Sequence, residues 1–256
     1  MGYLKPNMIY TEDCRVGMAK IRSSSVDLLV TEPVYQAGPL EGTLSSIRFQ
    51  KHFQHRYGII PNKNYQDFSV EWLNQAKRAM SHIACGFIFC HWTNLRFLLN
   101  AINITGFRLV NHIIWQHPTS NHDIGLKKQF NPIHSHVLYI TKLSLKEDRS
   151  RVFNRISEYS SSKGKLYFED VWIPSYQSRS NENNQTVGYS ILEKCIRIAS
   201  NEGALVLDPF LASNNLLTAC SRNKRKFIGF TVSDKDYEMI QNHKTLENLD
   251  SFLKNG

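Results

Sequence analysis

The sequence predicts an α/β fold with a doubly wound sheet, and three observations support this prediction. Two apolar runs, residues 26–30 and 205–207, each stop close to a carboxylate followed by proline, in Glu32-Pro33 and Asp208-Pro209. Buried parallel strands deliver polar groups to the carboxyl edge of an α/β sheet in this way. Other apolar runs of strand length alternate with amphipathic segments of helical length. Two such strand ends predict one shared site at a single edge of the sheet.

The individual elements follow from apolar periodicity and from capping residues. Phe68, Trp72, Ala76 and Met80 form one stripe, which predicts a helix whose aromatic side chains belong to the core. Gly106 ends a second helix, and Asn215 is a candidate cap for a later one. Strands are expected at 26–30, 86–90, 110–115, 137–141 (antiparallel to its neighbours), 205–207 and 226–231, and helices at 65–80, 95–104, 191–198 and 216–221.

Composition is that of an ordinary globular protein, with an excess of basic residues. The 256 residues are 41% hydrophobic and 21% charged, enough for one α/β core, and the net charge of +9 favours a polyanionic partner. None of the five cysteines shows Cys-x-x-Cys spacing, so we expect reduced thiols in the core of a cytoplasmic or nucleoid-associated protein, or a nuclear one in a eukaryote. The N-terminus lacks a signal-peptide pattern, and no apolar run reaches the length of a membrane span.

Two long segments interrupt the alternation of strands and helices. Residues 36–65 interleave basic and aromatic side chains, a composition suited to tracking a nucleic-acid backbone and stacking on bases. Residues 117–182 are also rich in Lys and Arg, although acidic residues among them leave a solvated surface as the alternative. The candidate nucleic-acid contacts are Arg48, Lys51, His55, Arg56, Arg149 and Arg151.

Histidines are numerous, and the pairs His134/His136 and His117/His122 invite a metal assignment. No Cys or Glu at ligand spacing accompanies them, so we predict no metal site and assign these histidines to the surface and to nucleic-acid contacts.

In their order along the chain, these motifs resemble the amino-group DNA methyltransferases of the circularly permuted β class. Those enzymes methylate adenine N6 or cytosine N4 from S-adenosylmethionine. Their Asp-Pro-Pro-Tyr motif is matched by residues 32–35, and their Asp-Pro-Phe-x-Gly-Ser-Gly-Thr motif by residues 208–215. Further ordered matches are Asp13-Cys14, residues 25–30, Gly106-Phe107, Ile113-Ile114-Trp115, residues 227–230 and Tyr237.

The resemblance implies a Rossmann-like methyltransferase fold in a single permuted domain over residues 1–256. In this fold 36–65 is the loop after the catalytic motif, and 117–182 is the inserted target-recognition region. The catalytic carboxylate and carbonyl accept hydrogen bonds from the flipped base's amine, and an aromatic ring stacks on that base. These roles fall on Glu32, Pro33 and Tyr35. The resemblance places the S-adenosylmethionine contacts on Asp13, Asp208, Phe210, Ser213 and Thr231.

Several positions depart from the family pattern. Glu32 replaces Asp and moves the carboxylate by about an ångström, a displacement that can cost on the order of a hundredfold in rate. Ala212 and Asn214 replace two glycines, although Asn tolerates a left-handed turn. Thr231 replaces the acid that holds the ribose. Residues 183–188 lack the family's lysine, and His134-Ser135 stands for His-Glu.

Together these departures favour a DNA-binding protein with impaired or absent catalysis, supporting an active homologous subunit in a heterodimer. Two alternatives remain open. The first is an active methyltransferase with an unusual cofactor pocket. The second is a protein that binds or modifies RNA, for which no sequence signature is present.

Overall fold

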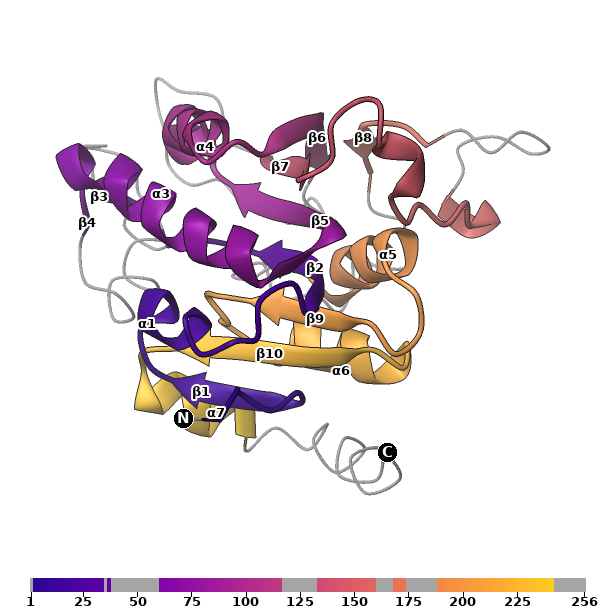
Figure 1. The fold of residues 1–256 in the computed structure, drawn as a ribbon. Coiled ribbons are helices and arrows are strands. Elements are labelled where there is room, and N and C mark those ends of the chain that lie inside the picture. The colour runs from indigo at the N-terminus through magenta and orange to yellow at the C-terminus, as the bar shows by residue number, and fades with distance from the viewer. Residues whose placement is uncertain are drawn as a thin grey trace.

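The computed structural model describes residues 2–34, 36–37, 60–116, 133–159, 168–173 and 188–241. An eight-stranded sheet forms the centre of the molecule (Figure 1). Its strands, in spatial order, are β1 (Met8–Thr11), β10 (Lys226–Thr231), β9 (Leu205–Asp208), β2 (Val26–Thr31), β5 (Met80–Cys90), β7 (His134–Thr141), β6 (Arg108–Gln116) and β8 (Val171–Trp172). A separate parallel pair joins β3 (Gln36–Ala37) to β4 (Ile60–Pro61).

All neighbouring strands of the large sheet are parallel except at β7, which is antiparallel to both β5 and β6. The predicted doubly wound fold and the antiparallel strand at 137–141 are therefore confirmed. The carboxyl ends of β10, β9, β2, β5 and β6 lie at one edge of the sheet, together with the amino end of β7. We call this edge the catalytic edge, after the catalytic residues that the sequence predicts there.

Helices cover both faces of the sheet, and the buried side chains divide accordingly into two clusters. Along β5, Phe87 and Phe89 point to one face, while Ile88 and Cys90 point to the other. This alternation explains why the strands are apolar throughout. One face packs against α1 (Cys14–Met18), α3 (Asn62–Ala79) and α4 (Trp92–Ile104), and the other against α5 (Tyr189–Ala199), α6 (Asn215–Arg222) and α7 (Asp234–Gln241).

The predicted core residues are confirmed. Phe68, Trp72, Ala76 and Met80 are all buried, as are the five cysteines, which form no disulfide. No helix in the described ranges is long and apolar enough to cross a membrane.

Element boundaries differ from the sequence prediction where polar residues hide the pattern. Strand β5 begins at Met80 rather than at residue 86, because its first residues, including the exposed Ile83, do not form an apolar run. Asn214, rather than Asn215, precedes α6, and its side chain makes no capping hydrogen bond. The predicted cap is therefore wrong.

The two predicted insertions are only partly described. Most of 36–65 lies outside the described residues, although helix α3 begins within it, at Asn62. Within 117–182, β7 and β8 are strands of the central sheet, and two short 3₁₀ turns, η1 (Asp148–Ser150) and η2 (Ser157–Tyr159), lie between them. This interval therefore contributes to the core as well as to any recognition surface.

Candidate active site

The two carboxylate-proline motifs meet at the catalytic edge. Strands β2 and β9 are parallel neighbours, with Leu29 opposite Leu207, so that both motifs emerge side by side. The Thr31 hydroxyl donates a hydrogen bond of 2.6 Å to Asp208 Oδ1, and both residues are buried. A charge-assisted hydrogen bond of this kind contributes roughly 1.5–3 kcal/mol. The predicted shared edge is present, and a buried polar contact joins its two halves.

Side chains from two helices hold the backbone after Glu32-Pro33 through hydrogen bonds. The Tyr65 hydroxyl, on α3, donates to the Val34 carbonyl oxygen at 2.8 Å. The Asn94 amide, on α4, donates to the Tyr65 hydroxyl at 2.9 Å. Burial raises the pKa of Tyr65, so this residue remains a neutral donor. These contacts fix the path of the chain that carries the predicted catalytic groups.

Glu32 is half-buried and Pro33 is buried. The Glu32 charge affects the pKa of Cys90, which lies at the end of the neighbouring strand β5. Burial chiefly raises the pKa of the Cys90 thiol, and the nearby Glu32 carboxylate raises it further. Glu32 thus places its negative charge at the end of β5. Tyr35 lies outside the described residues.

The loop after β9 adopts its path without glycine. Phe210 N–H donates to Asp208 Oδ1 at 3.0 Å, and Leu211 N–H donates to the Phe230 carbonyl at 2.8 Å. Asn214 has φ −78° and ψ −4°, which is right-handed, so the left-handed turn that Asn would tolerate is not used. At Gly229 an added Cβ would lie 2.7 Å from a Leu211 methyl carbon, so the Leu211 side chain would have to shift. The loop therefore packs closely on β10.

The predicted cofactor residues occupy adjacent strand ends of the catalytic edge. Phe210 lies edge-on to Trp72 with ring centroids 5.3 Å apart, and Ser213 Oγ accepts the Asn215 N–H at 3.4 Å. Thr231 is buried, and its hydroxyl accepts the Ser233 N–H at 3.3 Å. The hydroxyl of Thr231 therefore supports the turn into α7.

Asp13, at the carboxyl end of β1, is paired with Arg15. Its carboxylate accepts the Arg15 backbone N–H at 2.8 Å and forms an ion pair with the guanidinium at 2.8 Å. Burial would raise the pKa of Asp13, but the Arg15 hydrogen bonds outweigh it and leave this pKa lowered. Arg15 also bonds Glu71 at 2.7 Å. Asp13, a predicted cofactor contact, is thus held as an anion.

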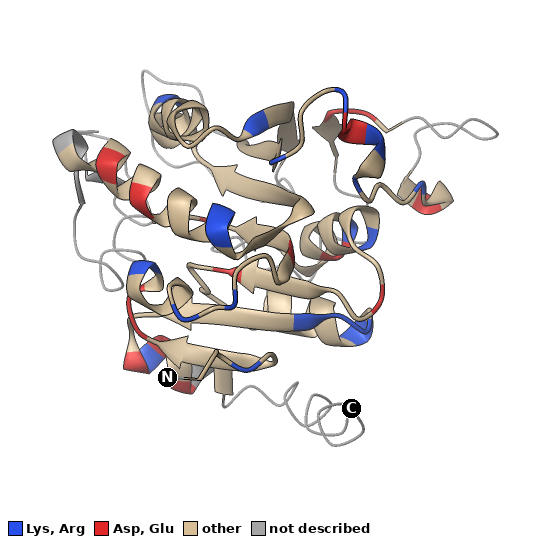
Figure 2. Ribbon diagram, viewed as in Figure 1, with Lys and Arg blue, Asp and Glu red and all other residues tan. Residues whose placement is uncertain are grey.

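The predicted nucleic-acid contacts fall into two groups. Arg48, Lys51, His55 and Arg56 lie outside the described residues. Arg149 is exposed, whereas the Arg151 side chain is only 11% exposed. Figure 2 shows charges of both signs scattered over the described elements rather than one basic face.

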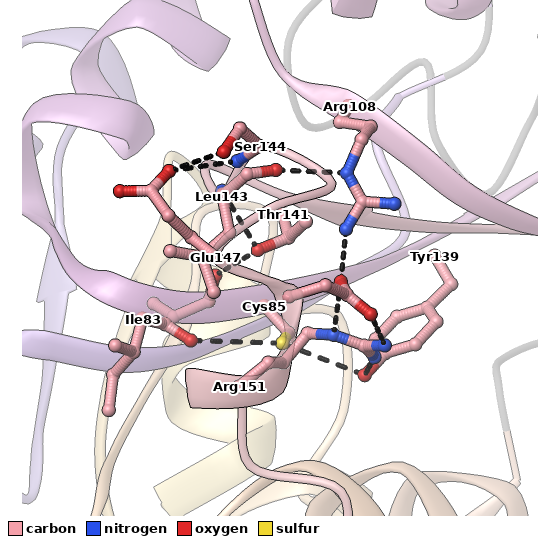
Figure 3. A network of polar contacts seen from close by, with 11 residues as sticks. Ile83, Cys85, Arg108, Tyr139, Thr141, Leu143, Ser144, Glu147 and Arg151 are labelled. Atoms are coloured by element: carbon pink, nitrogen blue, oxygen red, sulfur yellow. Dashed lines mark hydrogen bonds and ion pairs between the residues drawn. The ribbon is translucent and has the colours of Figure 1, made fainter.

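Arg151 belongs to a polar network that fastens the segment after β7 to the sheet (Figure 3). Its guanidinium bonds Asp148 and the Tyr139 hydroxyl, and Asp148 also pairs with Arg108. The network lies where Cys85 of β5 pairs with Thr141 of β7. Cys85 is five residues along β5 from Cys90, so the network is roughly 16 Å from the strand end beside Glu32, toward the opposite edge of the sheet. The observed contacts of Arg151 are therefore structural.

Four histidines gather at the catalytic edge beyond Glu32. His112 Nε2 lies 2.8 Å from His136 Nδ1, and the rings of His134 and His136 are 5.2 Å apart. Burial, reinforced by His112, His134 and His91, lowers the pKa of His136 to about 4. Among the described residues, no three His, Cys, Asp or Glu side chains are arranged to hold a metal ion.

The buried His136 predicts a loss of stability in mild acid. Because its folded pKa lies below the usual value near 6.5, stability is full above 6.5 and falls as pH drops toward 4. We expect the free energy of unfolding to fall by about 2 kcal/mol between pH 7 and pH 5. Denaturant titration of the wild type and His136→Gln measures this. The variant should lose most of the dependence, and His82→Gln, an exposed histidine at the opposite edge, should retain it. An equal pH dependence in all three proteins would contradict the prediction.

Sequence reasoning missed Tyr65, Asn94 and Arg15. Asn94 offers a signal, since it stands at a buried position of its helix, in line with Leu98, but its partner lies 29 residues away. Periodicity does not identify such partners.

Comparison with known proteins agrees with this geometry. A family model described as a DNA methylase, of the N6/N4 methyltransferases, matches residues 26–242. The type II methyltransferase M.HpaI of Haemophilus parainfluenzae is 25% identical over 244 residues, covering 91% of this chain and 71% of that protein. M2.DpnII of Streptococcus pneumoniae is 22% identical, covering 87% of this chain and 83% of that protein.

Solved structures share the fold at lower identity. The M1.HpyAVI–SAM complex superposes with a TM-score of 0.60 and 18% identity, covering 91% of this chain and 96% of that one. The cytosine-N4-specific PvuII DNA methyltransferase gives a TM-score of 0.67 and 14% identity, with 97% and 92% coverage.

Proposed function

Because the chain belongs to the N6/N4 amino-group DNA methyltransferase family, we propose that it transfers a methyl group from S-adenosylmethionine to an exocyclic amine of adenine or cytosine in DNA. The observation that carries this proposal is the hydrogen bond between Thr31 and Asp208. It holds the strand end that bears the catalytic carboxylate against the strand end that bears the cofactor motif.

Glu32 and Pro33 supply the chemistry that an exocyclic amine requires. The amine is a poor nucleophile because its lone pair is delocalised into the ring. The Glu32 carboxylate and the Pro33 carbonyl accept its two N–H groups, which localises the lone pair. Fixed acceptors stabilise the charge that develops on the amine as it attacks. Tyr65 and Asn94 support this chain segment through the Val34 carbonyl.

The residues of β1, β9 and β10 fit the cofactor in most respects. When bound, S-adenosylmethionine supplies an electrophilic methyl group on a sulfonium. Asp13 and Asp208 offer acceptors, while Phe210 and Ser213 lie on the loop after β9, which has no left-handed residue to strain. Thr231 offers a hydroxyl in place of the ribose acid and so supplies a weaker acceptor. We therefore expect S-adenosylmethionine to bind, with lower affinity than an acid at this position would give.

A non-catalytic role beside an active homologous subunit is the second candidate, and Thr231 is the observation that favours it. Its hydroxyl already accepts the Ser233 N–H, and a hydroxyl cannot hold two ribose hydroxyls as a carboxylate does.

A labelled-methyl transfer assay separates these candidates. The isolated chain is incubated with radiolabelled S-adenosylmethionine and mixed-sequence DNA, with RNA of the same sequence in parallel. Cofactor binding is measured by isothermal titration. We expect transfer to DNA and measurable binding heat, both diminished in Asp208→Asn. Absence of both transfer and binding heat, or transfer only when a homologous subunit is added, would support the second candidate. Transfer to RNA alone would replace DNA as the substrate.

A further inference from the structure

Trp92 differs from the other tryptophans of this chain. The sequence contains four, and Trp72, Trp115 and Trp172 are at most 7% exposed. Trp92 is 56% exposed. It is the first residue of α4 and follows the end of β5 by two residues, so it lies at the catalytic edge. A large indole left in water beside a reactive edge suggests a partner with an aromatic face.

Imidazole rings continue from Trp92 across the same edge. The rings of His91 and Trp92 are 5.6 Å apart, those of His134 and His136 5.2 Å, and those of His112 and His136 4.9 Å. Register places them together, since Cys90 is opposite His136 and Ile114 is also opposite His136. The strand alternation puts His112, His134 and His136 on the face that α3 and α4 cover.

Two residues near Trp92 set the local charge, His136 and Arg96. Burial keeps His136 neutral at physiological pH, because its pKa is lowered to about 4. Arg96 is exposed and lies one helical turn beyond Trp92, on the same side of α4. An exposed aromatic ring that stacks on bases, with a cation beside it for the backbone, is the usual surface for unpaired strands.

Resting on the proposed function, we infer that Trp92 stacks on an unpaired nucleobase of the DNA strand entering the active site, a base other than the one methylated. Opening the duplex for methylation unstacks neighbouring bases, and an exposed indole compensates for the lost stacking.

The test measures the binding of single-stranded DNA in the absence of cofactor, so it does not depend on catalysis. Two fluorescently labelled single-stranded probes of equal length are compared by anisotropy, an oligothymidylate and an abasic oligonucleotide with the same phosphodiester backbone. Trp92→Ala should bind the oligothymidylate about 5- to 150-fold more weakly than wild type, the range that one base–aromatic stack spans. Its affinity for the abasic probe should not change. Trp92→Phe should bind both probes almost as wild type does. Tyr3→Ala removes another exposed aromatic, 70% exposed and preceding β1, and should change neither.

Intrinsic fluorescence gives a second readout, since Trp92 is the exposed tryptophan of the four. Oligothymidylate should quench wild-type emission, and Trp92→Phe should abolish the quenching while retaining affinity. Unchanged oligothymidylate binding by Trp92→Ala, or equal losses on both probes, would overturn the inference. If either result were found while the wild type still transfers methyl groups normally, only the inference about Trp92 would fail and the proposed function would stand. Normal stacking without any methyl transfer would contradict only the proposed function.

Discussion

Glu32→Gln should lower the rate of methyl transfer by the isolated chain by a factor of about 10²–10³, the usual cost of removing one preorganised electrostatic contact. Gln keeps the length of the side chain but removes its charge and replaces one acceptor oxygen by a donor. The amide oxygen that remains is uncharged and therefore a weaker acceptor for the amine. Initial rates at saturating S-adenosylmethionine and DNA measure the effect, which should fall on kcat more than on KM because the contact strengthens as the amine gains charge.

Two variants control for this result. Glu202→Gln makes the same change in charge at the opposite edge of the sheet, on an exposed acid paired with Lys224, and should leave the rate unchanged. Glu32→Asp retains the carboxylate, so it should be more active than Glu32→Gln. If Glu32→Gln transfers methyl groups at the wild-type rate, Glu32 is not the catalytic carboxylate.

Arg151→Ala should lower the free energy of unfolding by about 2–3 kcal/mol, since it removes a half-buried ion pair, a hydrogen bond to the Tyr139 hydroxyl and cation–π contacts. Arg151 bonds Asp148 at 3.1 Å, and its guanidinium carbon lies 5.0 Å from the Tyr139 ring centroid. Its loss leaves Asp148 with only Arg108 among the ion-pair partners seen in the described residues. Urea denaturation followed by circular dichroism measures the change.

Arg149→Ala is the matched control, because it removes the same side chain two residues away from an exposed position. It should change stability by less than about 0.5 kcal/mol, as most exposed substitutions do. Under conditions where both variants are folded, DNA affinity against salt concentration tests the expectation that these arginines contact phosphate. Arg151→Ala should keep the wild-type slope. A flatter slope with unchanged stability would show that Arg151 binds DNA instead.

The sequence alone determined the α/β class, the order of most strands and helices, and the two strand ends that carry Glu32 and Asp208. These features are local. An apolar run, a helical stripe such as Phe68, Trp72 and Ala76, and a carboxylate-proline pair are each written in a few adjacent residues. Burial on both faces of a parallel sheet imposes that pattern directly on the chain. The antiparallel strand over β7 was also accessible from the sequence.

Tertiary structure alone decided how the site is held together. Thr31 and Asp208 are 177 residues apart, and Tyr65 meets Val34 across 31 residues, so neither contact has a local pattern. The same holds for Arg151, whose basic side chain fits a DNA contact in sequence but is bound to Asp148 and Tyr139 in the fold. Asn214 takes right-handed angles, although an Asn in place of the family's glycine would also have tolerated a left-handed turn. A side chain's partner depends on which strands become neighbours, and that is fixed only when the whole sheet assembles.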